Sequence, residues 1–349
     1  MKIGMIGLPN SGKTTIFNAL TRAQVQVTPY SGAQAEPNLA VVDVGDERVL
    51  RLAEIYKPKK MTWATVEIVD FVAREGAFSG NLLGLIKTVD ALALVVRNFK
   101  DDFMGPPTPL QDVETVEGEL LLSDLIVAET RLERIEAGNH RGKKTPAVEL
   151  EARVLDKVLA HLNAERPLRT LALSADEEKL LRGFQFLTQK PLMIILNSSE
   201  TNFGKNQEVL AQLDQRYRTI EFAGSFEMEL AQLDEQAAQM FMEDMGITAS
   251  ARDRLTQCAY EVLGYISFFT VGQDEVRAWN VCRGDTAVQA AGTIHSDLMR
   301  GFIRAECFAY DDLLACGSEK AVREHGRLRL EGKNYRVQDG DILSIRFNV

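Results

Sequence analysis

Residues 7–14 read Gly-Leu-Pro-Asn-Ser-Gly-Lys-Thr and match the pattern Gly-x-x-x-x-Gly-Lys-Ser/Thr. A short apolar run at 2–6 precedes them, and a helical pattern begins at Lys13. A strand, a glycine-rich loop and the start of a helix, in this order, surround a phosphate group with backbone N–H groups and the positive end of a helix dipole. The stretch therefore predicts a phosphate-binding loop; the alternative is a glycine-rich turn that carries an exposed lysine.

Each residue type in this loop has a physical task. The glycines allow the tight turn that brings backbone N–H groups against phosphate oxygens. The ammonium of Lys13 reaches the β- and γ-phosphates, and the hydroxyl of Thr14 can ligate Mg²⁺. We expect the nucleotide contacts of this loop to come from Asn10, Ser11, Gly12, Lys13, Thr14 and Thr15.

A further contact to the magnesium ion is expected at the end of another strand. Asp70 ends the apolar run 66–69. Because ligands bind at the carboxyl edge of a parallel sheet, a carboxylate there faces the loop and can hold Mg²⁺ through water. We predict a Mg²⁺ site at Thr14 and Asp70; the alternative for Asp70 is an ordinary turn aspartate.

Short apolar runs typical of buried strands alternate with helical stretches in the first two hundred residues. The runs are 40–44, 66–70, 91–96 and 193–197. This alternation predicts an α/β fold with a doubly wound, mostly parallel sheet that is covered on both faces, as in P-loop NTPases.

Two other patterns interrupt or follow this one. Apolar residues at four- and three-residue spacing occur at 121, 125, 128, 132 and 135, and again at 148, 152, 155, 159 and 162. They predict two antiparallel helices joined by the polar turn 138–144. Short alternating segments follow at 267–271, 275–281, 302–308, 335–337 and 342–347.

We therefore predict three parts. A discontinuous nucleotide-binding domain covers 1–110 and 166–264, a helical coiled-coil insertion covers 111–165, and a strand-rich domain covers 265–349.

Composition limits the function further. The net charge of −10 is atypical of a protein that binds nucleic acid over its whole surface, so any RNA contact must be local. The four cysteines show no metal-ligand spacing and indicate a reduced, cytoplasmic protein. No apolar run reaches the length of a membrane span, so we expect no membrane partner.

These features resemble the YchF subfamily of Obg-related P-loop NTPases along nearly the whole chain. The segments that carry the resemblance include Gly7–Thr14, Glu36-Pro37-Asn38, Asn197-Ser198-Ser199-Glu200, Val276-Arg277-Ala278-Trp279 and Val337-Gln338-Asp339-Gly340-Asp341. The resemblance implies that 265–349 is a TGS domain, a small β-grasp module, and that the helical pair is the coiled-coil insertion of the family.

The resemblance also implies how the base is bound. Most GTPases use Asn-Lys-x-Asp, in which the aspartate reads guanine, whereas this chain has Asn197-Ser198-Ser199-Glu200, like the Asn-x-x-Glu of the family. Glutamate is one methylene longer, so its carboxylate overshoots the guanine position. We expect ATP to bind at least as well as GTP, through Asn197, Glu200 and the aligned turn Ala223-Gly224; the sequence leaves both nucleotides open.

The chain departs from the family around the γ-phosphate. Gln34 stands where the family has a threonine of switch I, and Ala73 replaces the glycine of Asp-x-x-Gly. Phosphoryl transfer depends on charge positioned in this region. We therefore expect binding with weak or altered hydrolysis; the alternative is a nucleotide-sensing protein that does not hydrolyse. A small-molecule kinase is disfavoured, because the strand-rich C-terminal pattern supplies neither an acceptor pocket nor an arginine-rich lid.

The resemblance implies a partner in translation, the ribosome or its RNA. From residue 265 onward the chain has 11 Lys/Arg and 12 Asp/Glu, so this part is nearly neutral in an acidic protein. We expect docking through the TGS-like part, and possible RNA contact at the basic turn 138–144, which alternatively is only an exposed hairpin tip. The sequence does not predict the oligomeric state.

Overall fold

The computed structural model describes residues 1–21, 37–71, 80–101, 104–139 and 145–348. By contacts the chain divides into two units. Unit 1 contains residues 1–40 and 67–251, and unit 2 contains residues 41–66 and 252–349.

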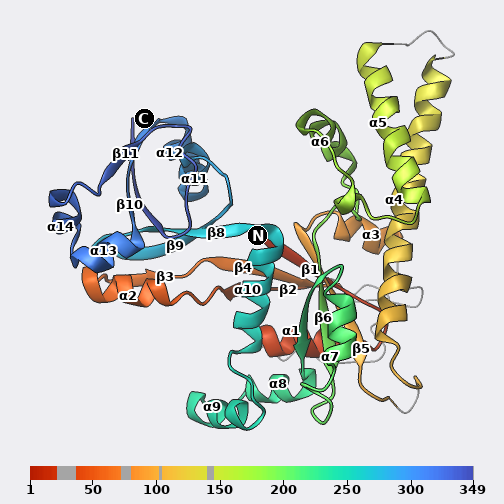
Figure 1. Cartoon of the computed structure of the whole chain (residues 1–349), viewed down its shortest axis with the longest axis horizontal. Coiled ribbons are helices and arrows are strands. Elements are labelled where there is room, and N and C mark those ends of the chain that lie inside the picture. Colours follow the sequence, from red (N-terminus) through yellow and green to blue (C-terminus); the bar gives the residue numbers. More distant parts are fainter. Residues whose placement is uncertain (22–36, 72–79, 102–103, 140–144, 349) are drawn as a thin grey trace. The chain divides into compact units, whose positions relative to one another are not determined.

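The first sheet has six strands in the order β2-β4-β1-β5-β6-β7 (Figure 1). Their bounds are β1 (Lys2–Ile6), β2 (Asn38–Asp43), β4 (Thr65–Asp70), β5 (Ala91–Asn98), β6 (Leu192–Ser198) and β7 (Arg218–Phe222). The pairs β1–β4, β1–β5, β5–β6 and β6–β7 are all parallel. All eight residues of β5 are buried, as expected of a central strand that is covered on both faces.

The helices of unit 1 cover this sheet and extend from it. They are α1 (Lys13–Thr21), α3 (Gly80–Ile86), α4 (Pro109–Asn139), α5 (Pro146–Asn163), α6 (Ala175–Leu181), α7 (Gln207–Leu213), α8 (Gly224–Leu230) and α9 (Glu235–Asp244), with 3₁₀ turns at Leu168–Thr170 and Arg182–Phe184. One buried cluster joins α3, α7 and the first turns of α4 to the strands. The predicted α/β fold with a mostly parallel sheet is confirmed.

The predicted helical pair consists of α4 and α5, which run side by side in Figure 1. Their apolar seam contains Ala128 and Ile135 from α4 and Val154, Leu155 and Val158 from α5. Thr145 caps the start of α5 by accepting from the backbone N–H of Val148, and Pro146 occupies the first turn. The predicted basic turn falls largely on residues 140–144, outside the described residues.

Unit 2 contains a second sheet of six strands in the order β11-β10-β12-β8-β9-β3. The strands are β3 (Lys60–Thr62), β8 (Tyr265–Thr270), β9 (Glu275–Cys282), β10 (Phe302–Ala309), β11 (Arg329–Glu331) and β12 (Asp341–Phe347). The helices are α2 (Glu47–Tyr56), α10 (Ala251–Leu263), α11 (Ala287–Ile294), α12 (Ser296–Arg300), α13 (Tyr310–Cys316) and α14 (Glu319–Glu324). Alanines of α11 pack on the buried face of this sheet.

Two details differ from the sequence-based expectation. Segment 335–337 forms no strand but only an isolated bridge from Arg336 to Thr286, while β11 supplies a strand that was not predicted. Segment 41–66 groups with unit 2, since β3 pairs in parallel with β9 from Lys60 to Thr62. The three domain boundaries derived from the sequence stay a prediction. Among the described residues, no helix is both long and apolar enough to cross a bilayer.

Candidate nucleotide-binding site

The loop between β1 and α1 has a backbone that only glycine permits at two positions. Gly7 and Gly12 have φ angles of +151° and +87°. A Cβ atom at Gly7 would lie 2.4 Å from the carbonyl oxygen of Val95, and one at Gly12 would lie 2.1 Å from Nδ2 of Asn197. The glycines of the motif therefore allow the loop to approach the strands behind it closely.

Asn197, in β6, joins this loop to a second turn. Its Nδ2 donates to the carbonyl oxygen of Ser11 at 3.0 Å, and its Oδ1 accepts from the backbone N–H of Gly224 at 3.1 Å. The side chain is only 3 % exposed, so both hydrogen bonds are shielded from water. Asn197 thus holds together two turns that are far apart in the sequence.

The turn at Ala223 and Gly224 lies beside Asn197, and its contact with the base stays a prediction. Its N–H groups are bonded within the protein: that of Ala223 donates to Oε1 of Glu227 at 3.1 Å, and that of Gly224 donates to Asn197. A Cβ atom at Gly224 would lie 2.5 Å from Oδ1 of Asn197. The turn therefore supports the loop through Asn197.

The ammonium of Lys13 lies inside the loop. The residue is 8 % exposed, and Nζ donates to the carbonyl oxygens of Gly7 at 2.9 Å and Leu8 at 3.0 Å. Burial lowers the pKa of Lys13 to about 8, and the nearby charge of Asp70 only partly opposes this. A third N–H of the ammonium remains for an anion, which would also raise the pKa again.

The carboxylate of Asp70 lies fully buried at the C-terminal end of β4. Its Oδ2 accepts from the hydroxyl of Thr14 at 3.1 Å and from Nδ2 of Asn38 at 3.3 Å, whereas Oδ1 has no hydrogen-bond partner. Burial raises the pKa of Asp70, and the bonds from Asn38 and Thr14 act in the opposite direction. A buried carboxylate oxygen without a donor is costly unless another group satisfies it.

Magnesium fits this pair of residues. Mg²⁺ prefers oxygen ligands and commonly binds through one or two protein groups, several waters and the phosphates of its nucleotide. Thr14 and Asp70 supply a hydroxyl and a carboxylate of this kind. No cluster of three His, Cys, Asp or Glu side chains suited to a metal ion occurs in the described part of the chain, so this site would depend on the bound phosphates.

Glu200 lies exposed in the turn that follows β6. The carboxylate of Glu221 in β7 holds this turn by two hydrogen bonds. Its Oε1 accepts from the hydroxyl of Ser198 at 2.5 Å, and its Oε2 accepts from the backbone N–H of Gly204 at 3.2 Å. Nδ2 of Asn206 donates to the same carboxylate. Glu221 therefore positions the segment that carries Glu200.

Comparison with known proteins identifies the protein family of this chain. The family model YchF-GTPase_C, described as a protein of unknown function, matches residues 265–348, and a model described as 50S ribosome-binding GTPase matches residues 2–126. The chain is 38 % identical to the ribosome-binding ATPase YchF of Bacillus subtilis, with 99 % of both chains covered. The chain belongs to the YchF family.

Other YchF proteins agree with this assignment. The ribosome-binding ATPase YchF of Escherichia coli O157:H7 is 37 % identical over the whole of this chain. The solved structure of the Schizosaccharomyces pombe YchF GTPase superposes with a TM-score of 0.86 at 30 % identity, covering 99 % of this chain and 97 % of that one. The resemblance read from the sequence motifs is therefore confirmed.

The structure brings most of the predicted YchF site residues to one edge of the parallel sheet. Asn10, Ser11, Gly12, Lys13, Thr14 and Thr15 form the loop and the first turn of α1, and Asp70, Asn197, Ala223 and Gly224 lie around them. Gln34 and Ala73, the two departures near the γ-phosphate, lie outside the described residues.

Two supporting residues were missed from the sequence. Asn38 donates to Asp70. The segment Glu36-Pro37-Asn38 was among those that carried the family resemblance, but the sequence assigned no role to Asn38. Glu221 had no signal, because its role depends on the pairing of β6 with β7.

Proposed function

We propose that this protein binds a nucleoside triphosphate with Mg²⁺ at the Gly7–Thr14 loop, hydrolyses it weakly, and acts on the ribosome. The observation that carries the proposal is the buried ammonium of Lys13, which is bonded to two loop carbonyls and lies near the buried carboxylate of Asp70. A chain gains nothing in stability from burying a lysine with a lowered pKa, so the arrangement is explained best by an anion that neutralises it.

The ground for proposing ATP is the base-reading segment. The Asn-x-x-Glu segment replaces the guanine-reading aspartate with Glu200, and Glu221 holds that segment in place. The YchF relatives from Bacillus subtilis and Escherichia coli O157:H7 are called ribosome-binding ATPases.

Competition between ATP and GTP tests the base. We expect ATP to displace a fluorescent ATP analogue at a lower concentration than GTP in the presence of Mg²⁺. In Glu200→Asp the ratio should move toward GTP, because the shorter carboxylate no longer overshoots the guanine edge; the shift should be several-fold, on the order of 1 kcal/mol. Glu208→Asp on α7 is the matched control. A clear preference of the unmodified protein for GTP would show that the base assignment is wrong.

Hydrolysis is the second part of the proposal, and Gln34 and Ala73 bear on it. Since both stand at positions that sense the γ-phosphate in relatives, a non-hydrolysing nucleotide sensor is the competing function. A single-turnover incubation with γ-labelled ATP and Mg²⁺ separates the two. Phosphate release above the enzyme-free blank supports weak hydrolysis and eliminates the sensor, whereas release equal to the blank with ATP fully bound supports the sensor.

The magnesium site gives its own prediction. In Asp70→Asn the neutral amide can no longer attract the cation, so the affinity for ATP should become nearly independent of Mg²⁺. We expect the gain in affinity on adding Mg²⁺ to fall by about tenfold relative to the unmodified protein, which corresponds to roughly 1.4 kcal/mol. Titrations with Mg²⁺ and with EDTA measure this gain. Asp90 precedes the N-terminal end of β5, away from the nucleotide loop, so Asp90→Asn should leave the gain in affinity on adding Mg²⁺ unchanged.

Ribosome docking through the C-terminal part is supported by a charge arrangement in unit 2. Arg304 of β10 and Arg346 of β12 are direct neighbours in the antiparallel register, and both are exposed. Like charges at paired positions destabilise a sheet. Glu306 accepts from Arg346 at 2.9 Å and offsets part of this repulsion. An anionic partner such as ribosomal RNA would offset the rest.

Reversing this charge tests the docking surface. Arg304→Glu should relieve the repulsion with Arg346, so the melting temperature should stay or rise, while cosedimentation with ribosomes should fall at least about fivefold at moderate salt. Arg283→Glu serves as a control in the same unit. Cosedimentation that Arg304→Glu leaves unchanged would contradict this surface.

A further inference from the structure

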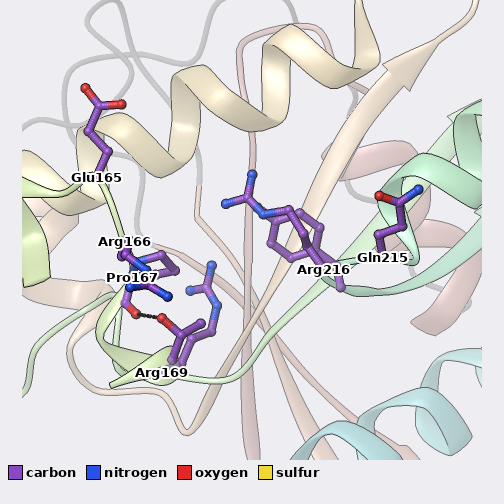
Figure 2. Close-up of a pocket in the computed structure, with 8 residues that line it drawn as sticks. Glu165, Arg166, Pro167, Arg169, Gln215 and Arg216 are labelled. Atoms are coloured by element: carbon purple, nitrogen blue, oxygen red, sulfur yellow. Dashed lines mark hydrogen bonds between the residues drawn. The ribbon is translucent and has the colours of Figure 1, made fainter. Parts of the chain in front are cut away.

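A cavity of about 330 Å³ lies in unit 1, away from the nucleotide loop. Figure 2 shows that two segments line it, Glu165–Thr170 after α5 and Gln215–Tyr217 before β7. The strands of the sheet are parallel, and the nucleotide loop follows the C-terminal end of β1. The segment before β7 therefore belongs to the opposite, N-terminal edge of the sheet.

Three arginines dominate the lining. Arg166 and Arg169 come from one segment and Arg216 from the other, and Figure 2 shows Arg216 across the opening from the first two. Glu165 is the only acidic residue in the lining. The cavity is therefore positively charged in a protein whose net charge is −10.

A single buried carboxylate fixes two of these arginines. Glu117 of α4 is 5 % exposed and accepts from Nη2 of Arg216 at 3.0 Å and from the hydroxyl of Tyr217 at 2.6 Å, and it forms an ion pair with Arg169. The guanidinium groups of Arg169 and Arg216 also lie 5.8 and 5.4 Å from the ring centroid of Tyr217. Glu117 carries one negative charge, so two guanidinium groups leave an excess of positive charge.

Burial, more than this excess of charge, sets the pKa of Arg169. Burial lowers its pKa to about 10; the proximity of Arg216 acts in the same direction, and Tyr217 opposes it. Arg169 stays charged at neutral pH, but the charged form is held at a cost that an anion in the cavity would remove.

The backbone that presents Arg166 is strained. Glu165 has a φ angle of +56°, in the left-handed region that a residue with a side chain adopts at a cost of about 1 kcal/mol. Its N–H donates to the carbonyl oxygen of Leu162 at 2.9 Å, and the N–H of Arg166 donates to that of His161 at 3.2 Å, so the turn is closed tightly at the end of α5. Pro167 then restricts the backbone φ angle at the next position. Arg166 is exposed at this turn, and none of the ion pairs in the described residues involves it.

We propose that this cavity is a second anion site, which binds a phosphate group between Arg166, Arg169 and Arg216. Planar guanidinium groups match the oxygens of a phosphate in pairs, and pre-oriented ones lose little freedom on binding. The volume falls at the lower end of small-ligand pockets and suits a phosphate with part of its ester. The ligand is a phosphate monoester or a phosphodiester of RNA. The site does not depend on the proposed nucleotide function.

Binding of pyrophosphate and of a 12-nucleotide RNA to the full chain tests this proposal. The measurements use the Lys13→Ala background, which removes the cation of the nucleotide loop. Each of Arg166→Gln and Arg216→Gln should weaken binding about tenfold, the worth of one charge-assisted hydrogen bond, and should lower the salt dependence of RNA binding. Arg153→Gln, an exposed arginine of α5, is the control for net charge and should have little effect.

The two probes distinguish the sources of the phosphate. Loss of pyrophosphate binding in both cavity variants indicates a small phosphate ester, and loss confined to RNA indicates the RNA backbone; either result supports the site. Arg166 has no role in the core, so its variant stays informative if Arg216→Gln unfolds. The proposal is overturned if neither probe binds, or if Arg153→Gln weakens binding as much as the cavity variants do.

Discussion

Replacing Lys13 with alanine should lower the affinity for Mg-ATP by about a hundredfold or more, or roughly 3 kcal/mol. The substitution removes the cation built into the loop and leaves the carbonyl oxygens of Gly7 and Leu8 without their donor. Isothermal titration of ATP measures the loss. Lys100→Ala, an exposed lysine after β5, should bind ATP normally. Equal affinity in Lys13→Ala and the unmodified protein would refute the site.

Removing the charge of Lys13 should lower the affinity for ATP but should not lower the stability of the nucleotide-free protein. Keeping the ammonium charged at a pKa of about 8, instead of the ordinary 10.5, costs the folded protein on the order of 3 kcal/mol at neutral pH. Lys13→Met, which keeps the apolar stem and removes the charge, should therefore leave the melting temperature of the nucleotide-free protein unchanged or raised. A protein that is destabilised by the charge but needs it for binding has a functional reason to retain it.

The pKa of Lys13 also determines how ATP affinity and stability depend on pH. Above pH 8 the empty loop loses the proton of Lys13, whereas phosphate oxygens in the complex would favour the charged form. Binding then requires proton uptake, so the affinity for ATP should fall as pH rises from 8, by up to about tenfold per pH unit. Without nucleotide, the unfolded chain holds more protons than the folded one between pH 8 and 10.5, so the stability of the folded state should rise over that interval. Lys13→Arg should bind with a flat pH profile, and an equal slope in this variant would contradict the assignment.

Asn197→Leu should reduce both the free energy of unfolding and the affinity for ATP. Leucine has the same number and branching of side-chain heavy atoms as asparagine but leaves two buried groups unpaired, the carbonyl oxygen of Ser11 and the N–H of Gly224. Each unpaired group costs about 1–3 kcal/mol, so a loss of roughly 2–6 kcal/mol in urea unfolding is expected. Because the loop loses its support, affinity should fall at least about tenfold.

A second buried amide provides the control for Asn197. Asn18 of α1 is 4 % exposed, and its Nδ2 donates to the sulfur of Met228 at 4.0 Å. Asn18→Leu should change stability without a comparable loss of ATP affinity. Equal losses of affinity in the two variants would show that Asn197 acts through general stability instead of through the loop.

The sequence alone determined the features that depend on consecutive residues. The order strand, glycine-rich loop and helix at 2–21 follows from local pattern, because glycine freedom, apolar runs and helix initiation act over a few residues. The seam of α4 and α5 followed from spacing for the same reason. The segments around Gly7–Thr14 and Asn197–Glu200, together with those at 276–279 and 337–341, indicated the family.

Only the tertiary structure decided which distant groups meet. The bonds from Asn197 to Ser11 and Gly224, the role of Glu221, the pairing of β3 with β9 and the three-arginine cavity all join segments that the order of strands brings together. Strand order is set by packing of the whole sheet, and no pattern of neighbouring residues encodes it. For this reason the sequence predicted the phosphate loop but not the side chains that hold it in place.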